Sequence, residues 1–366
     1  MRARFFGLRR FRLAHGFVVA ALLLPVVQRA DGAPRIRRCF DSGWRFSRGD
    51  ASGAEQPGFA DAAWRRLDLP HDWSIEGPYD EHAATGGPGG YLPAGIGWYR
   101  KHFAVPESLR GRRITVEFDG VSMNCEVWFN GRHLGGWPYG YTSFSFDLTP
   151  DLHFGEQPNL LAVRVDNSQQ PGSRWYSGSG IYRHAWITVT DSLHIAQWGT
   201  YVTTPAVSAD SATVRIRTGV RNGRSDAPSV MLVSEIVDAG NQVVATVQSD
   251  DSVPAASERE FDQTATLARP RLWSPGTPDL YRLRSRLVIG DRTIDEAETP
   301  FGVRQLDFDA DRGFRLNGEP VKLRGMCLHH DGGAVGAAVP EAVTSLRQRS
   351  TPWPQTIAST SSSSRT

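Results

Sequence analysis

Cysteine is scarce in this chain of 366 residues. Its three cysteines, Cys39, Cys125 and Cys327, are too few and too scattered for a disulfide framework or for a metal site built on paired cysteines. Long helical tracts rich in Ala, Glu, Lys and Leu are also absent, which argues against a helical bundle. The sequence therefore predicts a fold held together by packing, with few helices.

Turn-forming and aromatic residues are abundant instead. The chain has 37 Gly, 23 Pro and 11 Trp, a composition that favours short strands joined by turns. With 22% charged and 40% hydrophobic residues, it has the composition of a soluble globular protein. The formal net charge is only +2, so no nucleic-acid or other polyanionic partner is expected.

Residues 1–32 have the pattern of an export signal. Six arginines lie in this segment, five of them before an apolar run at 17–27, and the small residues Ala30 and Gly32 follow. The alternative is a membrane anchor, but the run has 11 residues and contains Pro25, whereas a span needs roughly 20. We expect a periplasmic or secreted protein without membrane attachment after the signal is removed.

Between Cys39 and about Val189, apolar and polar residues alternate in short segments. This period of two is typical of half-buried strands, and it runs through residues 114–118, 125–129 and 161–165. Asn130-Gly131 predicts a tight hairpin turn after the second of these segments. Several such strands over about 150 residues fit a jelly roll or a similar two-sheet sandwich.

A second block with the same alternation extends from about Leu193 to Pro300. Apolar residues alternate at 214–220 and at 281–289, and Gly290-Asp291 predicts a turn. A length of about 110 residues is that of an immunoglobulin-like sandwich. No cysteine lies inside the block, so packing alone would hold it.

Four ordered motifs carry a resemblance to a known family. They are LDLPHDWSIEGPY with GIGWYRKHF, then VSMNCEVWFNGRHLGGWPYGYTSFSFDLT, then VRVDNSQQPGSRWYSGSGIYRHAWI, and finally FGVRQLDFDADRGFRLNGEPVKLRGMCLHHDGG. In this order, from about Cys39 to Glu341, the chain resembles glycoside hydrolase family 2, most closely its β-galactosidase branch.

The resemblance implies a nearly all-β chain with several domains. After the signal peptide at 1–32, it implies a jelly-roll sugar-binding domain and an immunoglobulin-like β-sandwich, followed by the first strand, in VKLRGMCL, of an incomplete (β/α)₈ barrel. Beyond Glu341 the apolar periodicity disappears, and a Pro, Ser and Thr-rich, low-complexity tail is expected. The predicted boundaries are 33–191, 192–300, 301–343 and 344–366.

The family's chemistry is retaining hydrolysis, which needs two carboxyl groups about 5 Å apart. The resemblance implies that both are glutamates on later barrel strands, one of them within an Asn-Glu pair. Neither that signature nor an Asn-x-x-Arg-x-x-His-x-Pro segment occurs, and Phe301 to Thr366 is only 66 residues, whereas a barrel takes about 250. We therefore expect an amino-terminal portion of such an enzyme, without catalytic acid or nucleophile and without activity. A frame shift before the tail is our hypothesis for its cause.

Four residues are predicted to bind substrate. By resemblance, Asp166 and the adjacent Asn167 contribute sugar contacts to the active site, and Asp166 holds a sodium ion in some relatives; the alternative is an ordinary Asx turn that ends a strand. His329 matches a histidine that contacts the sugar, and His330 follows it. Adjacent strand residues point to opposite faces, so the two histidines do not fit one metal ion. No other cofactor is expected.

Trp175 and Tyr176 belong to the most distinctive local motif. Their rings could stack on a sugar, but in a Trp-rich sandwich we favour a packing role between domains.

Three other interpretations stay open. The chain could be a carbohydrate-binding module without catalysis, because a jelly roll is a common lectin architecture. The intact enzyme, which could be a homo-oligomer, could have β-glucuronidase or β-mannosidase specificity instead of cleaving β-galactosides. The product could also be non-functional, since an orphan barrel strand would expose unpaired backbone and favour aggregation.

Overall fold

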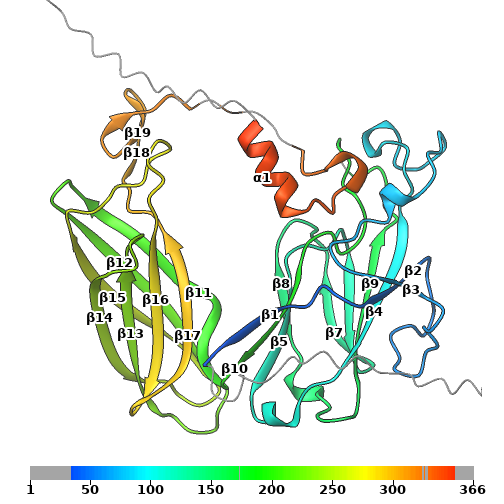
Figure 1. The fold of residues 1–366 in the computed structure, drawn as a ribbon, viewed down its shortest axis with the longest axis horizontal. Coiled ribbons are helices and arrows are strands. Elements are labelled where there is room, and N and C mark those ends of the chain that lie inside the picture. Colours follow the sequence, from blue (N-terminus) through cyan, green and yellow to red (C-terminus); the bar gives the residue numbers. More distant parts are fainter. Residues whose placement is uncertain (1–33, 173, 324, 326–328, 351–366) are drawn as a thin grey trace, which may run out of the picture. The chain divides into compact units, whose positions relative to one another are not determined.

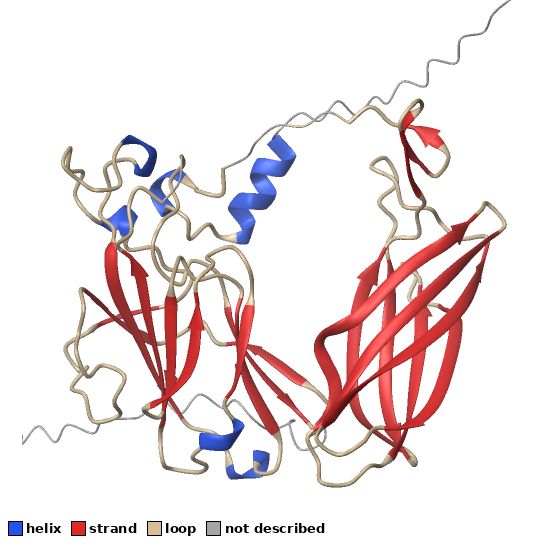
Figure 2. Ribbon diagram, turned by 180° about the vertical axis from the view of Figure 1, so that it is seen from behind, coloured by secondary structure: helices blue, strands red, loops and turns tan. Residues whose placement is uncertain are grey.

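The computed structural model of the protein describes residues 34–172, 174–323, 325 and 329–350, with the side chains of 346–350 excepted. The described residues fall within one compact unit, Pro34–Thr366. The predicted export signal at 1–32 lies outside the described residues, as does the Ser and Thr-rich end of the chain after residue 350. Strands dominate the described part (Figure 2).

The first sandwich consists of two antiparallel sheets (Figure 1). The smaller sheet has the order β1 (Ile36–Cys39), β10 (Ala185–Thr190), β5 (Arg113–Phe118) and β8 (Phe144–Asp147). The larger sheet has the order β3 (Arg65–Leu67), β2 (Trp44–Arg48), β4 (Gly95–Phe103), β9 (Asn159–Asn167), β6 (Cys125–Phe129) and β7 (Arg132–Trp137). Strands distant in sequence are neighbours in both sheets, as expected for a jelly roll.

The second sandwich also has two antiparallel sheets. One has the order β11 (Leu193–Val207), β12 (Ser211–Asn222) and β15 (Ser257–Ala268). The other has the order β14 (Val243–Ser252), β13 (Ser229–Val237), β16 (Tyr281–Ile289) and β17 (Arg292–Phe301). Seven strands in two sheets are the number found in a constant-type immunoglobulin domain. The predicted fold class, nearly all-β with a sugar-binding and an immunoglobulin-like sandwich, is confirmed.

The remaining elements are short. Strands β18 (Leu306–Asp309), β19 (Gly313–Leu316) and β20 (Glu319–Pro320) form a small sheet. Five 3₁₀ turns are present in the described part: η1 (Ser74–Glu76), η2 (Gly87–Gly89), η3 (Glu107–Leu109), η4 (Thr149–Asp151) and η5 (Gly333–Val335). The barrel strand expected in VKLRGMCL falls partly on residues 324 and 326–328, outside the described ones, and residues 321–323 and 325 are not in a strand.

A helix occurs where none was expected. Helix α1 (Glu341–Ser350) overlaps the start of the predicted low-complexity tail at residue 344. Its sequence, EAVTSLRQRS, contains no Gly or Pro, so nothing in it opposes a helix. The apolar periodicity that predicts a buried helix is absent, which is why the pattern did not reveal it. Among the described residues, no helix has the length and apolar character needed to cross a bilayer.

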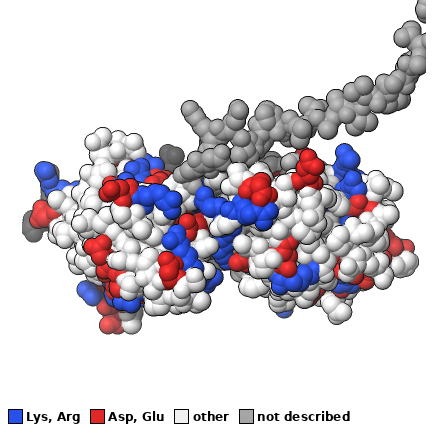
Figure 3. All heavy atoms as spheres, turned by 90° about the horizontal axis from the view of Figure 1, so that it is seen from below, with Lys and Arg blue, Asp and Glu red and all other residues white. Residues whose placement is uncertain are grey.

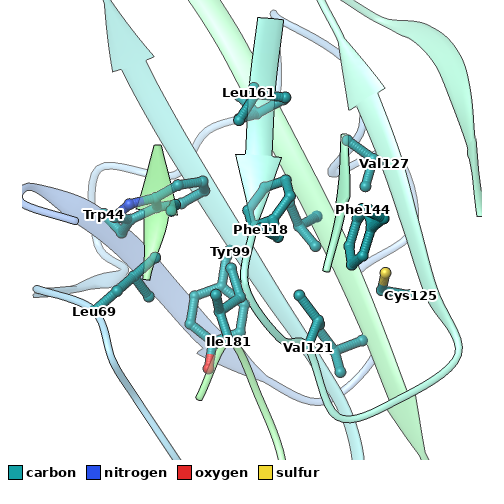
Figure 4. Packing of buried hydrophobic residues seen from close by; sticks show 14 of the residues in the cluster. Trp44, Leu69, Tyr99, Phe118, Val121, Cys125, Val127, Phe144, Leu161 and Ile181 are labelled. Atoms are coloured by element: carbon teal, nitrogen blue, oxygen red, sulfur yellow. The ribbon is translucent and has the colours of Figure 1, made fainter. Parts of the chain in front are cut away.

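The apolar side chains of the alternating segments form the cores. Phe118, Cys125 and Leu161 are among the fully buried residues that meet between the sheets of the first sandwich (Figure 4). Ile216 and Leu283 are fully buried in the second sandwich. The tight turns also form as predicted: Asn130 and Gly131 join β6 to β7 with φ values of 49° and 87°.

One expectation about burial needs correction. Strand β5 was predicted to be half-buried, yet Thr115 and Glu117, on its polar face, are only 6% and 7% exposed. Alternation reveals which face is apolar, but not whether other elements cover the polar face.

Charged groups of both signs are interspersed on the face shown in Figure 3, consistent with the low net charge.

A buried carboxylate ties the loop after β2 to the larger sheet of the first sandwich. Asp61, in this loop, accepts a hydrogen bond of 2.8 Å from Nε of Arg100, whose side chain is fully buried. Arg45 and His102 also contact the Asp61 carboxylate. Arg100 also donates to the backbone carbonyl oxygens of Ala54 and Gln56 in the same loop. The ion pair and these bonds together compensate the desolvated guanidinium.

We expect Asp61→Asn to lower the free energy of unfolding of the chain by about 3 kcal/mol, because it leaves the Arg100 charge buried without a counter-ion. Urea denaturation followed by tryptophan fluorescence measures this. The matched control is Asp262→Asn, which removes the partner of Arg215 at an exposed site and should leave stability almost unchanged. Equal losses of stability in the two variants would contradict a stabilising role of the buried Asp61–Arg100 pair.

Candidate functional site

The carboxylate of Asp72 lies at one end of the first sandwich, just before η1, and is 2% exposed. Its Oδ1 accepts hydrogen bonds from the backbone N–H groups of Ser74 and Ser179, both at 2.9 Å. Its Oδ2 accepts from the hydroxyl of Tyr176 at 2.6 Å and from the backbone N–H of Ala337 at 2.8 Å. A single carboxylate therefore connects segments near residues 72, 178 and 337.

Two glycines give the chain access to this carboxylate. Gly178 has φ 67° and Gly336 has φ 57°, a region that favours glycine. A Cβ atom at Gly178 would lie 2.5 Å from Oδ2 of Asp72, and one at Gly336 would lie 2.3 Å from it. Any side chain at either position would displace the carboxylate, so the glycine of the SGSG segment is required by close approach.

Asp166 and Asn167 occupy the end of β9, as predicted. Oδ1 of Asp166 accepts from the backbone N–H of Ser168 at 3.0 Å, which is the Asx turn of the alternative interpretation. Oδ2 lies 3.2 Å from Arg164, and the Asp166 side chain is 24% exposed. Partial burial opposes ionisation, but the hydrogen bonds from Ser168 and the charge of Arg164 lower the pKa of Asp166.

Asn167 is buried and has a positioning role. Its Nδ2 donates to the carbonyl oxygen of Gly178 and to the hydroxyl of Ser179, both at 2.8 Å. Its Oδ1 accepts from Gln170 at 2.8 Å. The amide thus holds the same segment that Asp72 holds, and its exposed surface is only 2%. Its predicted sugar contact is not tested by these bonds.

The two histidines lie in different environments. His330 is half-buried, with Nε2 3.3 Å from the carbonyl oxygen of Ser177. Its ring centroid is 5.5 Å from that of Tyr141 and 5.8 Å from that of Tyr182. His329 is exposed. The structure therefore brings His330 and Asn167 together around residues 177–179, within reach of Asp72.

The aromatic residues of the distinctive motif both make polar contacts. Tyr176 is half-buried, and its hydroxyl donates to Asp72. Burial and the neighbouring Asp72 carboxylate raise the pKa of the Tyr176 hydroxyl. Nε1 of Trp175 donates to the hydroxyl of Tyr141 at 3.1 Å, while 41% of Trp175 is exposed. Tyr176 therefore packs inside the chain, and Trp175 keeps an accessible ring.

This arrangement offers carboxylate, amide and hydroxyl groups that could hydrogen-bond to hydroxyl groups. The pKa of Asp166 is lowered, whereas a general acid of glycoside hydrolysis is favoured by a raised pKa, so this carboxylate is better suited to accept hydrogen bonds. The cavity next to these residues, lined by Asn167, Trp175 and Tyr176 among others, has a volume of about 10 Å³, enough for one water molecule. The described residues thus place several polar groups and an exposed tryptophan around one small cavity.

No cluster of three His, Cys, Asp or Glu side chains suited to a metal ion occurs in the described part of the chain. Near Asp166, the neighbouring charge is the cation of Arg164, which does not favour a second cation. Sodium binding at Asp166 stays a prediction for a complete site.

Comparisons with known proteins agree with this architecture. Residues 88–191 match the description "Glycosyl hydrolases family 2, sugar binding domain", and residues 193–304 match "Glycosyl hydrolases family 2". The chain belongs to glycosyl hydrolase family 2. Its predicted resemblance is confirmed.

Individual relatives of this family 2 chain are long proteins. It is 48% identical over 307 residues to a protein of Bacteroides ovatus named "Beta-galactosidase BoGH2A", covering 84% of this chain and 36% of that protein. It is 35% identical over 317 residues to a "Putative beta-glucuronidase" of Formosa agariphila, covering 87% of this chain and 30% of that protein. The chain thus spans about a third of the length of these curated relatives.

A solved structure of a family 2 member from Bacteroides cellulosilyticus superposes with a TM-score of 0.82 at 40% identity. The match covers 86% of this chain and 41% of that one.

The sequence interpretation missed Asp72 as the residue that organises the site. Its signal was present in LPHDWS, one of the motifs of the resemblance, because a polar Asp among apolar and aromatic residues is unusual unless it is hydrogen-bonded. Its partners could not be identified, since they come from segments about 100 and 265 residues later.

We expect Asp72→Asn to raise the exchange rates of the Ser179 and Ala337 amide hydrogens roughly tenfold, because hydrogen bonds to a charged acceptor are about twice as strong as neutral ones. Hydrogen exchange followed by NMR measures this. The control is Asp80→Asn, which weakens an exposed turn contact to His82 and should leave both amides unchanged. Unchanged exchange in Asp72→Asn would contradict the proposed role of the carboxylate.

Proposed function

We propose that this chain forms the amino-terminal part of a retaining glycosidase that releases terminal β-D-galactosyl units. The observation that carries the proposal is the 48% identity over 307 residues with a protein named β-galactosidase. In this function, the first sandwich supplies sugar contacts and the second supports it. The two catalytic carboxyl groups would come from the barrel that the family resemblance implies.

Asp166 is the described residue best suited to contact substrate. Its carboxylate is ionised, partly exposed and held by Ser168 and Arg164 at the end of β9. An ionised oxygen that accepts from a sugar hydroxyl makes a charge-assisted hydrogen bond. Asn167 acts behind it by holding residues 178 and 179, and His330 is held against Ser177 beside them. His329 is exposed, and by the family resemblance it also belongs to the proposed binding set.

The setting of this enzyme is part of the proposal. The arginine-rich start of the chain with its apolar run supports export to the periplasm or the medium. The mixed surface charge supports a saccharide, and no polyanion, as the partner.

A preparation of the 366-residue chain is expected to release no chromophore from a nitrophenyl β-galactoside above the buffer blank. Protonation of the leaving oxygen and attack on the anomeric carbon need a carboxyl pair about 5 Å apart. The reaction is followed by absorbance over hours at several enzyme concentrations. Turnover that follows the protein through successive purification steps would refute this expectation.

The role of Asp166 is testable in a chimera in which residues 34–340 replace the corresponding part of the Bacteroides ovatus β-galactosidase. We expect Asp166→Asn to lower kcat/KM for a β-galactoside by roughly 10- to 100-fold, the value of one charge-assisted hydrogen bond. Asp147→Asn is the matched control, because Asp147 also closes an Asx turn and pairs with Arg113. Equal kcat/KM values for the two variants would exclude the role.

β-Glucuronidase activity is the second candidate, because two relatives at 35% and 32% identity are named as putative or actual β-glucuronidases. Assaying nitrophenyl β-galactoside and β-glucuronide side by side with the natural full-length enzyme separates the two. A higher kcat/KM for the glucuronide would overturn the galactosidase proposal. If calorimetry shows sugar affinity in an enzyme that hydrolyses neither compound, the chain functions as a binding module.

A further inference from the structure

A second pocket lies away from the Asp72 site, within the same compact unit. Its volume is about 450 Å³, within the range of 300 to 1,000 Å³ typical of small-molecule sites. One wall is the polar face of the smaller sheet of the first sandwich, including Thr115, Glu117 and Thr188. The opposite wall comes from β11 and from the end of β17.

Hydrogen bonds hold the two walls together. Asp295 of β17 is fully buried and accepts from Nε of Arg35 at 3.0 Å. The same carboxylate accepts from the backbone N–H of Ile195, in β11, at 2.7 Å. Gln197 of β11 donates to Oε2 of Glu117, in β5, at 2.9 Å. The pocket is thus bounded by residues that these hydrogen bonds hold in place. The contact from Gln197 also shows which element covers Glu117 on the polar face of β5.

A large irregularity in β11 presents Trp198 at this pocket. Ile195 pairs with Val220 and Thr200 pairs with Thr218, so four residues of β11 oppose one residue of β12. Such bulges redirect side chains and are frequent beside functional sites. Gly199 is required in the bulge, since a Cβ there would lie 2.8 Å from Cβ of Ala196.

Trp198 itself is unusual in two respects. Its φ is 54°, a left-handed conformation that is unfavourable for a bulky side chain. In spite of this unfavourable conformation, the side chain is not packed in the interior, since 63% of the residue is exposed. The conformational cost is therefore not offset by packing within the described structure, and strain of this kind is concentrated at ligand sites.

The charges around the pocket favour a neutral ligand. Each of its three arginines is paired with a carboxylate: Arg35 with Asp295, Arg37 with Glu117 and Arg113 with Asp147. His194, also in the wall, has its pKa lowered to about 4 by burial and by Arg113, so it carries no charge at neutral pH. An anion would find no unpaired cation among these groups, whereas hydroxyl groups would find both donors and acceptors.

We propose that this pocket is a non-catalytic saccharide-binding site in which the Trp198 ring stacks on a sugar and the half-buried Gln197 and Thr188 hydrogen-bond its hydroxyl groups. A sugar ring has an apolar C–H face that suits an aromatic surface and a polar edge that suits carboxylate and amide groups. Thr200, which is half-buried in β11, adds a hydroxyl partner on the opposite wall. The site would hold one or two units of a saccharide chain away from the cleaved bond.

The test is titration of the full chain with lactose, followed by NMR of the tryptophan indole N–H signals. The signal of Trp198 is identified by its loss in Trp198→Gly, a substitution that also relieves the left-handed strain and so should preserve folding. We expect this signal to shift with saturation at millimolar lactose. Calorimetry should show that Trp198→Gly weakens binding roughly tenfold or more, because it removes the stacking surface.

Two variants serve as controls. Trp198→Phe retains an aromatic face and should recover most of the affinity. Tyr201→Ala removes a ring of similar exposure on the same strand, one that lies near Arg217 and does not line the pocket, and should bind lactose as the unmodified chain does.

Three results would overturn the proposal. One is the absence of any lactose-dependent shift of the Trp198 signal. Another is equal lactose affinity of Trp198→Gly and Tyr201→Ala. The third is a shift of the same signal by inorganic phosphate at lower concentrations than lactose, which would identify an anion site. Because the readout is binding, its outcome does not depend on hydrolysis by the intact enzyme.

Discussion

Desolvation of carboxylates is the constraint on which the described structure depends. A buried charge is costly unless hydrogen-bond donors or opposite charges surround it, and the chain satisfies this requirement in two different ways. Asp61 pairs with Arg100 and so ties the loop after β2 to the larger sheet. Asp295 of β17 pairs with Arg35. Asp72 is instead satisfied by four neutral donors from three segments of the chain. Each carboxylate therefore specifies which distant segments must meet.

The Asp72 arrangement also explains how a sandwich can hold the loops at one of its ends in a defined conformation. Loops normally lie on the surface and vary in conformation, yet the segment at residues 177–179 is bonded to Asp72 and Asn167 and contacts His330. Asp166 emerges from the adjacent strand end with its carboxylate ionised and partly exposed. A rigid supporting layer behind a few polar groups is what a sugar site requires for orientation.

Much of the fold could be predicted because its determinants are local. Alternation over residues 114–118 and 161–165 identified strands, and Asn130-Gly131 identified a turn through the backbone angles it requires. Of the site, the positions of Asp166 and Asn167 at a strand end were predictable for the same reason. The burial of Glu117 was not, since it depends on Gln197 from another sandwich. Helix α1 escaped prediction because its sequence carries no apolar period.

The sequence by itself determined the strands, the turns and, through ordered motifs, membership of glycosyl hydrolase family 2. These properties depend on residues close together in the chain, where a period of two or a glycine has direct structural meaning. Only the tertiary structure decided that Asp72 bonds to Ala337, 265 residues later, and that Trp198 faces a pocket walled by Glu117. Such contacts arise when sheets and loops pack in three dimensions, and no local pattern encodes which donors will reach a given acceptor.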